Sequence, residues 1–468
     1  MITMTLDEIA AITGGRLVNA DPAAIVTGPV EYDTRKLAPG GLFVAFDGEK
    51  VDGHDFAAAA IAGGAAAVLG TKDTGQPGVV VEDQLLAVAR LARVVVDRLS
   101  RPAAENPMQP QDLSGLTVVG LTGSSGKTTT KDYIGQLLAR LGPTIAPSGS
   151  LNNELGHPYV ALKATTETKF LVLEMGSRGV GHIRHLTEVA PPRVGVVLNI
   201  GAAHIGEFGS VEGTALAKGE LVEALPEDGV AVLNADDPLV AGMAPRTAAK
   251  VVLFGESAGA DVRASDVTLD ARGRAAYKLN GFPVRLGVTG RHQVSNTLAA
   301  AAVAMQLGLS AEEAAAALSD VTIASSRRMD VFERPDGITV IDDSYNANPT
   351  STAAALRALA VLAAGRRSVA VLGYMAELGD FERSGHEEVG RLAAELGVDR
   401  LIAVAGAAPI LDGAATVAHW EGEPVLAADQ KAAIAELDLH PGDVVLVKGS
   451  RYRTWEVVDS LRPEGVRP

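Results

Sequence analysis

The chain has 468 residues, more than one hydrophobic core usually supports, so two or three domains are expected. Hydrophobic residues make up 47% of the sequence and charged residues 21%, which is typical of a folded α/β protein and excludes a disordered chain. A net charge of −16 without a long run of Lys or Arg argues against broad binding to nucleic acid or to an anionic membrane.

The sequence contains no cysteine, which excludes disulfides, thiolate catalysis and Cys-ligated metal sites. Met1–Gly15 lacks a basic segment followed by an apolar one, and no apolar run is long enough to span a membrane. The expected location is therefore cytoplasmic.

The first predicted domain covers residues 1–110 and is a small α/β unit. A strand is expected over Gly41–Phe46, and an alanine-rich helix is expected from near Phe56. The segment Ser100–Asp112 is polar and rich in proline, which is typical of a linker. We therefore place the first domain boundary at residue 110.

Residues 111–323 alternate between strand-like and helix-like segments, the pattern of a parallel sheet covered by helices. The alternation ends in a helix-rich stretch over Gln293–Leu318 and then restarts, so a third, Rossmann-like domain is expected over residues 324–468. The expected strands of these two domains are Leu116–Leu121, Phe170–Leu173, Val194–Leu198 and Val230–Leu233, followed by Ile338–Ile341, Ser368–Leu372, Leu401–Val404 and Val444–Val447.

A phosphate-binding loop is the strongest local signal. An apolar strand leads into Gly123-Ser124-Ser125-Gly126-Lys127-Thr128-Thr129, and a helix with one apolar face (Ile134, Leu137, Leu138, Leu141) follows. This arrangement points backbone N–H groups at a phosphate, while Lys127 can reach the β and γ phosphates and the Thr128 hydroxyl can bind Mg²⁺. The loop is shorter than the general P-loop, whose first glycine would fall at Leu121. The alternative is a flexible turn capped by a serine.

Three further polar residues follow successive strands of this domain. Glu174 ends one strand, His204 follows the next, and Lys218 lies on the helix after that. Ligands of open α/β sheets bind at the carboxyl ends of the strands, so Glu174 is well placed to hold the Mg²⁺ of a nucleotide. Taken alone, His204 could be a packed or surface histidine, and Lys218 a solvated helix lysine.

Together these segments resemble the Mur ligase family, whose members add amino acids to UDP-N-acetylmuramic acid. The matching segments are Gly123–Thr128, Asn152-Asn153-Glu154-Leu155-Gly156, Leu173–Gly176, Asn199–His204 and Ala217–Glu220. The resemblance implies ATP as substrate and two Mg²⁺ ions, one bound by Glu174 and one by His204. It also implies that Lys218 is carbamylated and so becomes a carboxylate-like metal ligand. The expected catalytic residues are Lys127, His204 and Lys218, and Asn152 and Asn153 are expected to contact the substrate.

In the first domain, Asp33-Thr34-Arg35, Phe43–Gly48 and Asp52–Phe56 resemble the family's uridine-nucleotide-binding domain. Thr34 and Arg35 are therefore expected to bind the UDP-linked substrate. Without the resemblance, an Asx turn with a surface ion pair is the favoured interpretation of Asp33–Arg35.

In the third domain, Arg328 and Asp343 match the family segments that hold adenine and ribose, and Asn296 matches an asparagine near the adenine. Gln293 stands where the family usually has an asparagine, so no role is assigned to it. Asn346 and Asn348 are expected to contact the substrate.

Within the family, four segments resemble the members that attach D-alanyl-D-alanine to UDP-N-acetylmuramoyl-tripeptide. These are Asp342–Pro349, Leu372–Gly379, His386 and Lys448–Arg451. The Asp-Asn-Pro-Arg box and the Lys-Gly-His-Glu ending of members that add the third amino acid are absent from the sequence. The implied reaction transfers the ATP γ-phosphate to a carboxylate, after which an amine displaces phosphate from the acyl phosphate.

Two alternatives remain open. One is another amide ligase of the same architecture, either diamino-acid-adding or polyglutamylating. The other is a P-loop nucleotide switch without ligase chemistry, which the series of metal-ligand types at successive strand ends argues against. We expect a monomer whose partners are small molecules, with the outer domains closing on the central one because two domains contribute ATP contacts.

Overall fold

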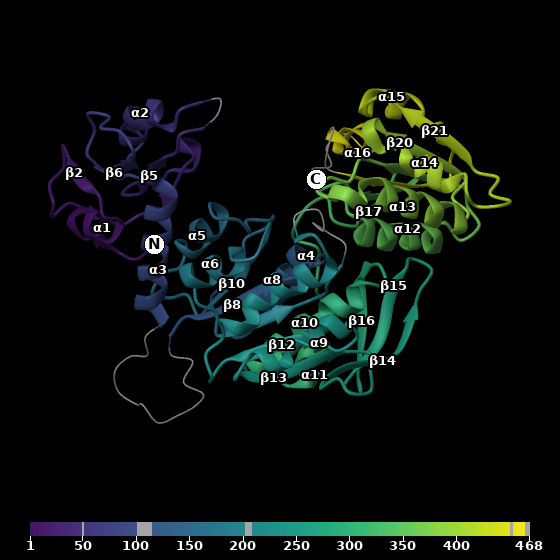
Figure 1. Ribbon diagram of the computed structural model, residues 1–468, viewed down its shortest axis with the longest axis horizontal. Helices are drawn as coiled ribbons and strands as arrows, with labels where there is room; N and C mark the ends of the chain where they lie inside the picture. The colour runs from purple at the N-terminus through teal and green to yellow at the C-terminus, as the bar shows by residue number, and fades with distance from the viewer. Residues whose placement is uncertain (49–50, 101–114, 202–207, 450–452, 464–468) are drawn as a thin grey trace.

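The computed structural model describes residues 1–48, 51–100, 115–201, 208–449 and 453–463. The described chain forms three α/β domains, with the first (purple) and the third (green to yellow) at opposite ends of the central one (Figure 1). The predicted linker Ser100–Asp112 lies, after Ser100, outside the described residues. Among the helices described, none is both long enough and apolar enough to cross a membrane.

The N-terminal domain is built on a five-stranded sheet in the order β2-β7-β6-β5-β4, parallel except for the β2–β7 pair. The predicted strand and helix are confirmed as β5 and α2. The bounds are β1 (Met4–Thr5), α1 (Leu6–Thr13), β2 (Arg16–Val18), β3 (Ile25–Val26), β4 (Val30–Glu31), β5 (Leu42–Ala45), α2 (Ala57–Ala62), β6 (Ala67–Gly70), β7 (Gly78–Val80) and α3 (Gln84–Ser100).

The central domain has a nine-stranded sheet in the order β16-β15-β14-β13-β12-β11-β8-β10-β9. All four predicted strands are present, and the strands from β9 to β14 pair in parallel. The strands are β8 (Thr117–Thr122), β9 (Thr144–Ile145), β10 (Phe170–Glu174), β11 (Val194–Val197), β12 (Val230–Asn234), β13 (Lys250–Gly255), β14 (Val262–Leu269), β15 (Arg274–Leu279) and β16 (Phe282–Thr289). The helices are α4 (Lys127–Leu138), α5 (Gly156–Ala161), α6 (His182–Val189), α8 (Val211–Glu223), α9 (Pro238–Ala241), α10 (Gln293–Gln306) and α11 (Ala311–Ser319).

The antiparallel strands β14 to β16 were not predicted from the sequence. The turn between β15 and β16, at Asn280-Gly281, has left-handed backbone at both residues, with φ of 45° and 94°. Asn-Gly is the preferred pair for such a two-residue hairpin turn, so this dipeptide is the signal that could have revealed the hairpin.

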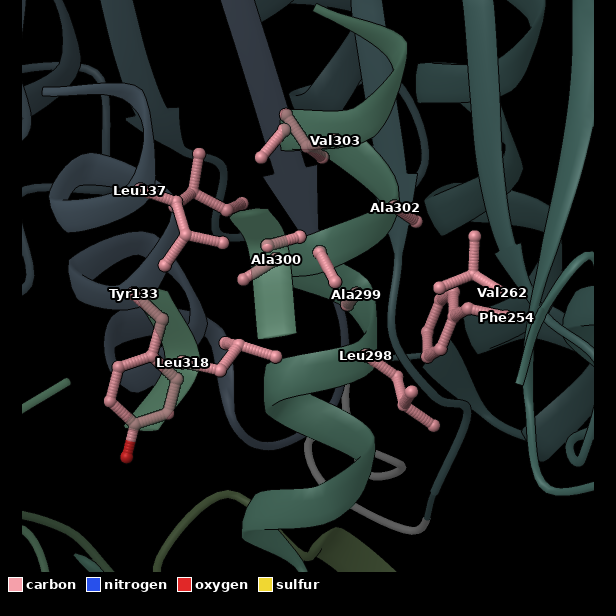
Figure 2. Packing of buried hydrophobic residues seen from close by; sticks show 14 of the residues in the cluster. Tyr133, Leu137, Phe254, Val262, Leu298, Ala299, Ala300, Ala302, Val303 and Leu318 are labelled. Atoms are coloured by element: carbon pink, nitrogen blue, oxygen red, sulfur yellow. The ribbon is translucent and has the colours of Figure 1, made fainter. Parts of the chain in front are cut away.

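Helix α10 forms the centre of the domain's core. Six consecutive residues, Ala299 to Ala304, are fully buried. Figure 2 shows α10 between Tyr133 and Leu137 of α4 on one side and Phe254 and Val262 of the sheet on the other. A helix that is apolar on all faces is stable only when it is enclosed in this way.

The C-terminal domain has a six-stranded sheet in the order β17-β18-β22-β19-β20-β21, parallel except for the β17–β18 pair. All four predicted strands are present. The strands are β17 (Asp330–Glu333), β18 (Thr339–Asp343), β19 (Ser368–Leu372), β20 (Arg400–Val404), β21 (Glu423–Ala427) and β22 (Val444–Lys448). The helices are α12 (Pro349–Ala363), α13 (Glu382–Glu395), α14 (Pro409–Ala414), α15 (Gln430–Ala435) and α16 (Trp455–Leu461).

The N-terminal and central domains share one hydrophobic core. Leu91 and Val95 of α3 belong to the same buried cluster as Val118 and Leu171 of the central sheet. The C-terminal domain instead has clusters of its own on the two faces of its sheet.

Candidate active site

An open cleft of about 540 Å³ lies between the central and C-terminal domains. The central domain contributes the loop before α4 and side chains at the carboxyl ends of its strands, and the C-terminal domain contributes the end of β18 and the segment before β17. The predicted site residues that line the cleft are Ser124, Ser125, Gly126, Lys127, Thr128, Thr129, Asn152, Asn153, Glu174, Lys218, Asn296, Arg328, Asp343, Asn346 and Asn348.

The loop between β8 and α4 has the geometry of an anion site. Gly126 precedes the helix with φ of +79°, a left-handed conformation that favours glycine, and a Cβ atom there would lie 2.5 Å from the Asn296 Oδ1 atom and displace that side chain. Gly126 at the N-cap has no side chain that could cap the helix, so the N–H groups of the first turn can bind an anionic ligand.

Asn199, just after β11, holds this loop in shape. Its carbonyl accepts the Ser124 N–H at 3.0 Å, and its side chain accepts the Ser125 N–H at 2.9 Å and donates to the Ser125 carbonyl at 3.2 Å. Asn199 was part of a matching segment but was not predicted as a site residue. These three hydrogen bonds hold the loop in its shape before any ligand binds.

Lys127 folds back over the loop, where its Nζ donates to the Gly123 carbonyl at 2.7 Å. Burial lowers the pKa of Lys127; the Glu174 carboxylate opposes this effect, and the Arg328 charge adds to it. A phosphate oxygen is a stronger acceptor than a carbonyl, so a bound phosphate would compete well for this ammonium group.

Glu174 is buried and held by three donors. Its Oε2 accepts the Thr128 hydroxyl at 2.7 Å, and its Oε1 accepts the Ser150 hydroxyl at 2.9 Å and the Asn152 amide at 2.7 Å. Carboxylate and hydroxyl oxygens are the ligands that Mg²⁺ prefers, so these residues fit a magnesium ion. Ser150 was missed in the sequence, where an isolated serine carries no signal.

Lys218 is buried on α8, with 2% of its surface exposed. Its Nζ makes no hydrogen bond or ion pair with any residue that the structure describes. Burial, and then the charge of Lys127, lower the pKa of Lys218 to about 7. The amine is therefore substantially neutral at physiological pH. His204, predicted beside it, lies outside the described residues.

On the opposite wall, Asp343 is the last residue of β18. Its Oδ1 accepts the Met329 N–H at 3.2 Å, and its Oδ2 accepts from Lys448 Nζ at 2.5 Å. The Arg328 guanidinium lies 4.1 Å from the centre of the Tyr345 ring. Lys448 was not predicted as a site residue, although it follows an apolar strand in the same way as Asp343.

Several predicted asparagines have structural partners. Asn296 donates to Gln293 Oε1 at 3.0 Å, so the residue to which no role was assigned orients the one that received a role. Asn153 accepts the Gly156 N–H at 2.8 Å beside α5, and Asn348 accepts the Ser351 N–H at 2.8 Å as the cap of α12. The Asn346 carbonyl accepts from Lys448 at 2.9 Å.

Thr34 and Arg35 lie in a turn of the N-terminal domain and do not line the cleft. Asp33 accepts the Arg35 N–H at 3.0 Å and the Arg35 Nε–H at 2.9 Å, which is the Asx turn with an ion pair considered above. The side-chain hydrogen bond from Arg35 lowers the pKa of Asp33 to about 2. Arg35 is 87% exposed and so available to a ligand of that domain.

Three family models match the chain. The Mur ligase family, catalytic domain matches residues 29–105; the Mur ligase middle domain matches residues 121–304; and the Mur ligase, glutamate ligase domain matches residues 327–451. These matches cover most of the chain.

Full-length relatives are also found. The UDP-N-acetylmuramoyl-tripeptide–D-alanyl-D-alanine ligase of Mycobacterium tuberculosis is 46% identical, with 96% of each chain covered. The crystal structure of MurF from Acinetobacter baumannii has a TM-score of 0.83 at 30% identity, with 98% of each chain covered. The MurF ligase from Thermotoga maritima in complex with ADP has a TM-score of 0.74 at 30% identity, covering 93% of this chain and 97% of that one.

Proposed function

The chain belongs to the Mur ligase family, and on this premise we propose that it joins D-alanyl-D-alanine to UDP-N-acetylmuramoyl-tripeptide at the expense of ATP. The relatives that support this reaction cover 96% and 98% of the chain, so the similarity extends over all three of its domains. The reaction is a step of peptidoglycan precursor synthesis.

The observation that carries the proposal is the composition of the cleft. Its central wall offers the helix amides, Lys127 and Glu174 to a triphosphate, and its C-terminal wall offers Asp343 and Arg328 to a nucleoside. A nucleotide held between the walls would have its terminal phosphate at the phosphate loop. The ADP complex of the Thermotoga ligase, a relative of the same fold, supports a nucleotide substrate.

A carboxylate is a poor acyl donor because it has no good leaving group, and transfer of a phosphoryl group to it supplies one. An oxygen of the tripeptide's terminal carboxylate attacks the γ-phosphorus of ATP, the bond to the β-phosphate oxygen breaks, and ADP leaves. The amine of D-alanyl-D-alanine then attacks the acyl carbon, loses a proton and expels phosphate. The helix amides and Lys127 stabilise the charge on the phosphoryl group as it moves.

Magnesium would be held by Glu174 and the Thr128 hydroxyl, and it supplies positive charge beside the transferring phosphoryl group. A second ion at His204 belongs to the proposal, as does a carbamate on Lys218. A neutral amine adds to CO₂ and loses a proton, and the low pKa of Lys218 supports that reaction because it keeps the amine neutral. The carbamate would also place a negative charge beside the Lys127 ammonium group, whose charge lowers the pKa of Lys218.

The remaining assignments are proposals of the same kind. Thr34 and Arg35 bind the uridine nucleotide, and Asn152, Asn153, Asn346 and Asn348 contact the substrates. The domains divide at residues 110 and 323. The enzyme acts as a monomer in the cytoplasm, where ATP and UDP-linked sugars are available.

The test is an assay of phosphate release with purified protein, Mg·ATP, UDP-N-acetylmuramoyl-tripeptide and D-alanyl-D-alanine, with each component omitted in turn. We expect release only in the complete mixture, together with a UDP-linked pentapeptide detected by mass spectrometry. Release that requires a free diamino acid or glutamate in place of the dipeptide would identify a different amide ligase. Release without any amine would identify a nucleotide switch.

A further inference from the structure

Helix α4, which begins at the phosphate loop, also holds the linker to the C-terminal domain. Asp132 and Gln136, four residues apart on one face of α4, and Arg140, in the turn after the helix, bind the segment that leads to the C-terminal domain. Asp132 Oδ2 accepts the Ser325 N–H at 3.0 Å, Gln136 bonds the N–H and the carbonyl of Thr322 at 3.0 and 2.9 Å, and Arg140 pairs with Asp320 at 2.7 Å. The linker is therefore docked along the helix as far as Ser325.

Ser325 is also bonded to the loop before α5. Its hydroxyl accepts the Gly149 N–H at 2.9 Å, and the Gly149 carbonyl accepts from Lys131 Nζ at 2.8 Å. Lys131 Nζ further contacts the Pro147 carbonyl and lies 3.0 Å from Asp132 Oδ1. The three side chains are almost completely buried, so these bonds are shielded from water.

The residue after Gly149 reaches Glu174, the carboxylate proposed to bind magnesium. Ser150 donates its hydroxyl to Glu174 Oε1 at 2.9 Å, and Asn152 donates to the same oxygen. A displacement of Gly149 would therefore move a donor that orients Glu174. Outer partners that orient a metal ligand commonly change metal affinity when they are removed.

Beyond Ser325 the backbone of the linker becomes strained. Arg327 and Met329 both have left-handed backbone, with φ of 60° and 54°, which is unfavourable for residues other than glycine. Arg328, between them, lines the cleft. The anchored part of the linker thus ends at Ser325, and the strained part begins two residues later.

We propose that Ser325 is a positioning residue, supported by Lys131 and Asp132. It connects the loop at Gly149–Asn152, which orients Glu174, to the strained segment Arg327–Met329, where we place the hinge of the C-terminal domain. The arrangement couples binding of Mg·nucleotide to the position of Arg328 and Asp343, because one buried junction supports both. The inference rests on the proposed function for its ligand, but the junction itself can be tested without any ligand.

The test compares Ser325→Ala with Gln136→Ala, which weakens the same linker without touching the loop at Gly149. In the absence of ligand, hydrogen–deuterium exchange at Gly149–Asn152 should accelerate about tenfold in Ser325→Ala and stay unchanged in Gln136→Ala. Calorimetry should show Mg·ADP binding about tenfold more weakly to Ser325→Ala, with little change when Mg²⁺ is omitted. Ser325→Thr, which keeps the hydroxyl, should restore both values.

Wild-type exchange at Gly149–Asn152 in Ser325→Ala would overturn the inference, whatever the activity of the protein. Equal weakening of Mg·ADP binding in both variants would also overturn it, since linker stability alone would then be the cause. Failure of the wild-type protein to bind Mg·ADP would instead overturn the proposed function, and the coupling to nucleotide with it.

Discussion

The central domain meets its two neighbours in different ways. Toward the N-terminal domain the contact is apolar, since α3 and the central sheet contribute to one buried cluster. A buried carboxylate, Glu31, adds a polar anchor there by accepting the Tyr159 hydroxyl at 2.9 and 3.0 Å. Toward the C-terminal domain the facing surfaces are polar and line an open cleft, crossed at the phosphate loop by a 3.5 Å bond from Asn348 to the Ser124 carbonyl.

The apolar junction therefore contributes mainly to stability, and the polar junction contributes mainly to ligand binding. A shared hydrophobic core resists movement, because sliding its halves apart would expose apolar surface to water. A polar interface with an open cleft can change its geometry at lower cost and can admit charged ligands. The prediction that both outer domains close on the central one therefore stays a prediction for the C-terminal domain, while the shared core argues that the N-terminal domain stays in place.

The largest effect is expected at the polar junction. Lys218→Ala should reduce turnover about a thousandfold, because it removes the proposed carbamate ligand, and added bicarbonate should not restore activity. Its unfolding midpoint and ATP-analogue binding should persist. Lys163→Ala, at a lysine that lies over the Tyr159 ring in the N-terminal junction, is the matched control and should keep full turnover. Normal turnover in Lys218→Ala would dismiss the carbamate role.

At the apolar junction the effect should fall on stability. Leu91→Ala removes a fully buried side chain from the shared core and should lower the free energy of unfolding by about 2–5 kcal/mol. Denaturant unfolding measures this change, and turnover well below the unfolding temperature should remain. Leu426→Ala, at an exposed leucine, should change stability by less than about 0.5 kcal/mol. Equal losses in the two variants would refute the shared core.

The same junction should be sensitive to acid through His157. This residue lies on α5, whose Val160 and Ala161 belong to the shared core, and burial lowers its pKa to about 4. Between pH 6.5 and about 4 the unfolded chain binds a proton that the folded chain does not, so stability falls as pH falls, by about 1.4 kcal/mol per unit.

Urea unfolding at pH 7, 6 and 5 should show this contribution disappear in His157→Leu. His419→Gln, at an exposed histidine, should follow the wild-type curve. A pH dependence that is the same in all three proteins would mean that other groups cause the acid sensitivity.

The smallest expected effect is a shorter distance between the central and C-terminal domains when ligands bind. Spin labels on the central and C-terminal domains should move closer when Mg·ATP analogue and both other substrates are bound. A label pair on the central and N-terminal domains should keep its distance. Movement of the N-terminal pair by an equal amount would remove the contrast between the two junctions.

The sequence by itself determined the elements whose signals are local. The strand, loop and helix from Thr117 to Leu138 could be predicted because their signals are contiguous, and the position of Glu174 because it ends an apolar strand. The predicted strands of the last two domains were all found for the same reason. The antiparallel strands β14 to β16 were missed, although the Asn280-Gly281 turn between β15 and β16 was visible in the sequence.

Only the tertiary structure decided which of these local features act together. Ser325 and Gly149 are 176 residues apart, and Lys448 and Asp343 are 105 residues apart, yet each pair is hydrogen-bonded. No periodicity or motif records such contacts, because they arise when sheets and linkers pack. Likewise, one domain junction is a hydrophobic core and the other is a polar cleft. This difference depends on which helix faces meet, and the faces meet only in the folded chain.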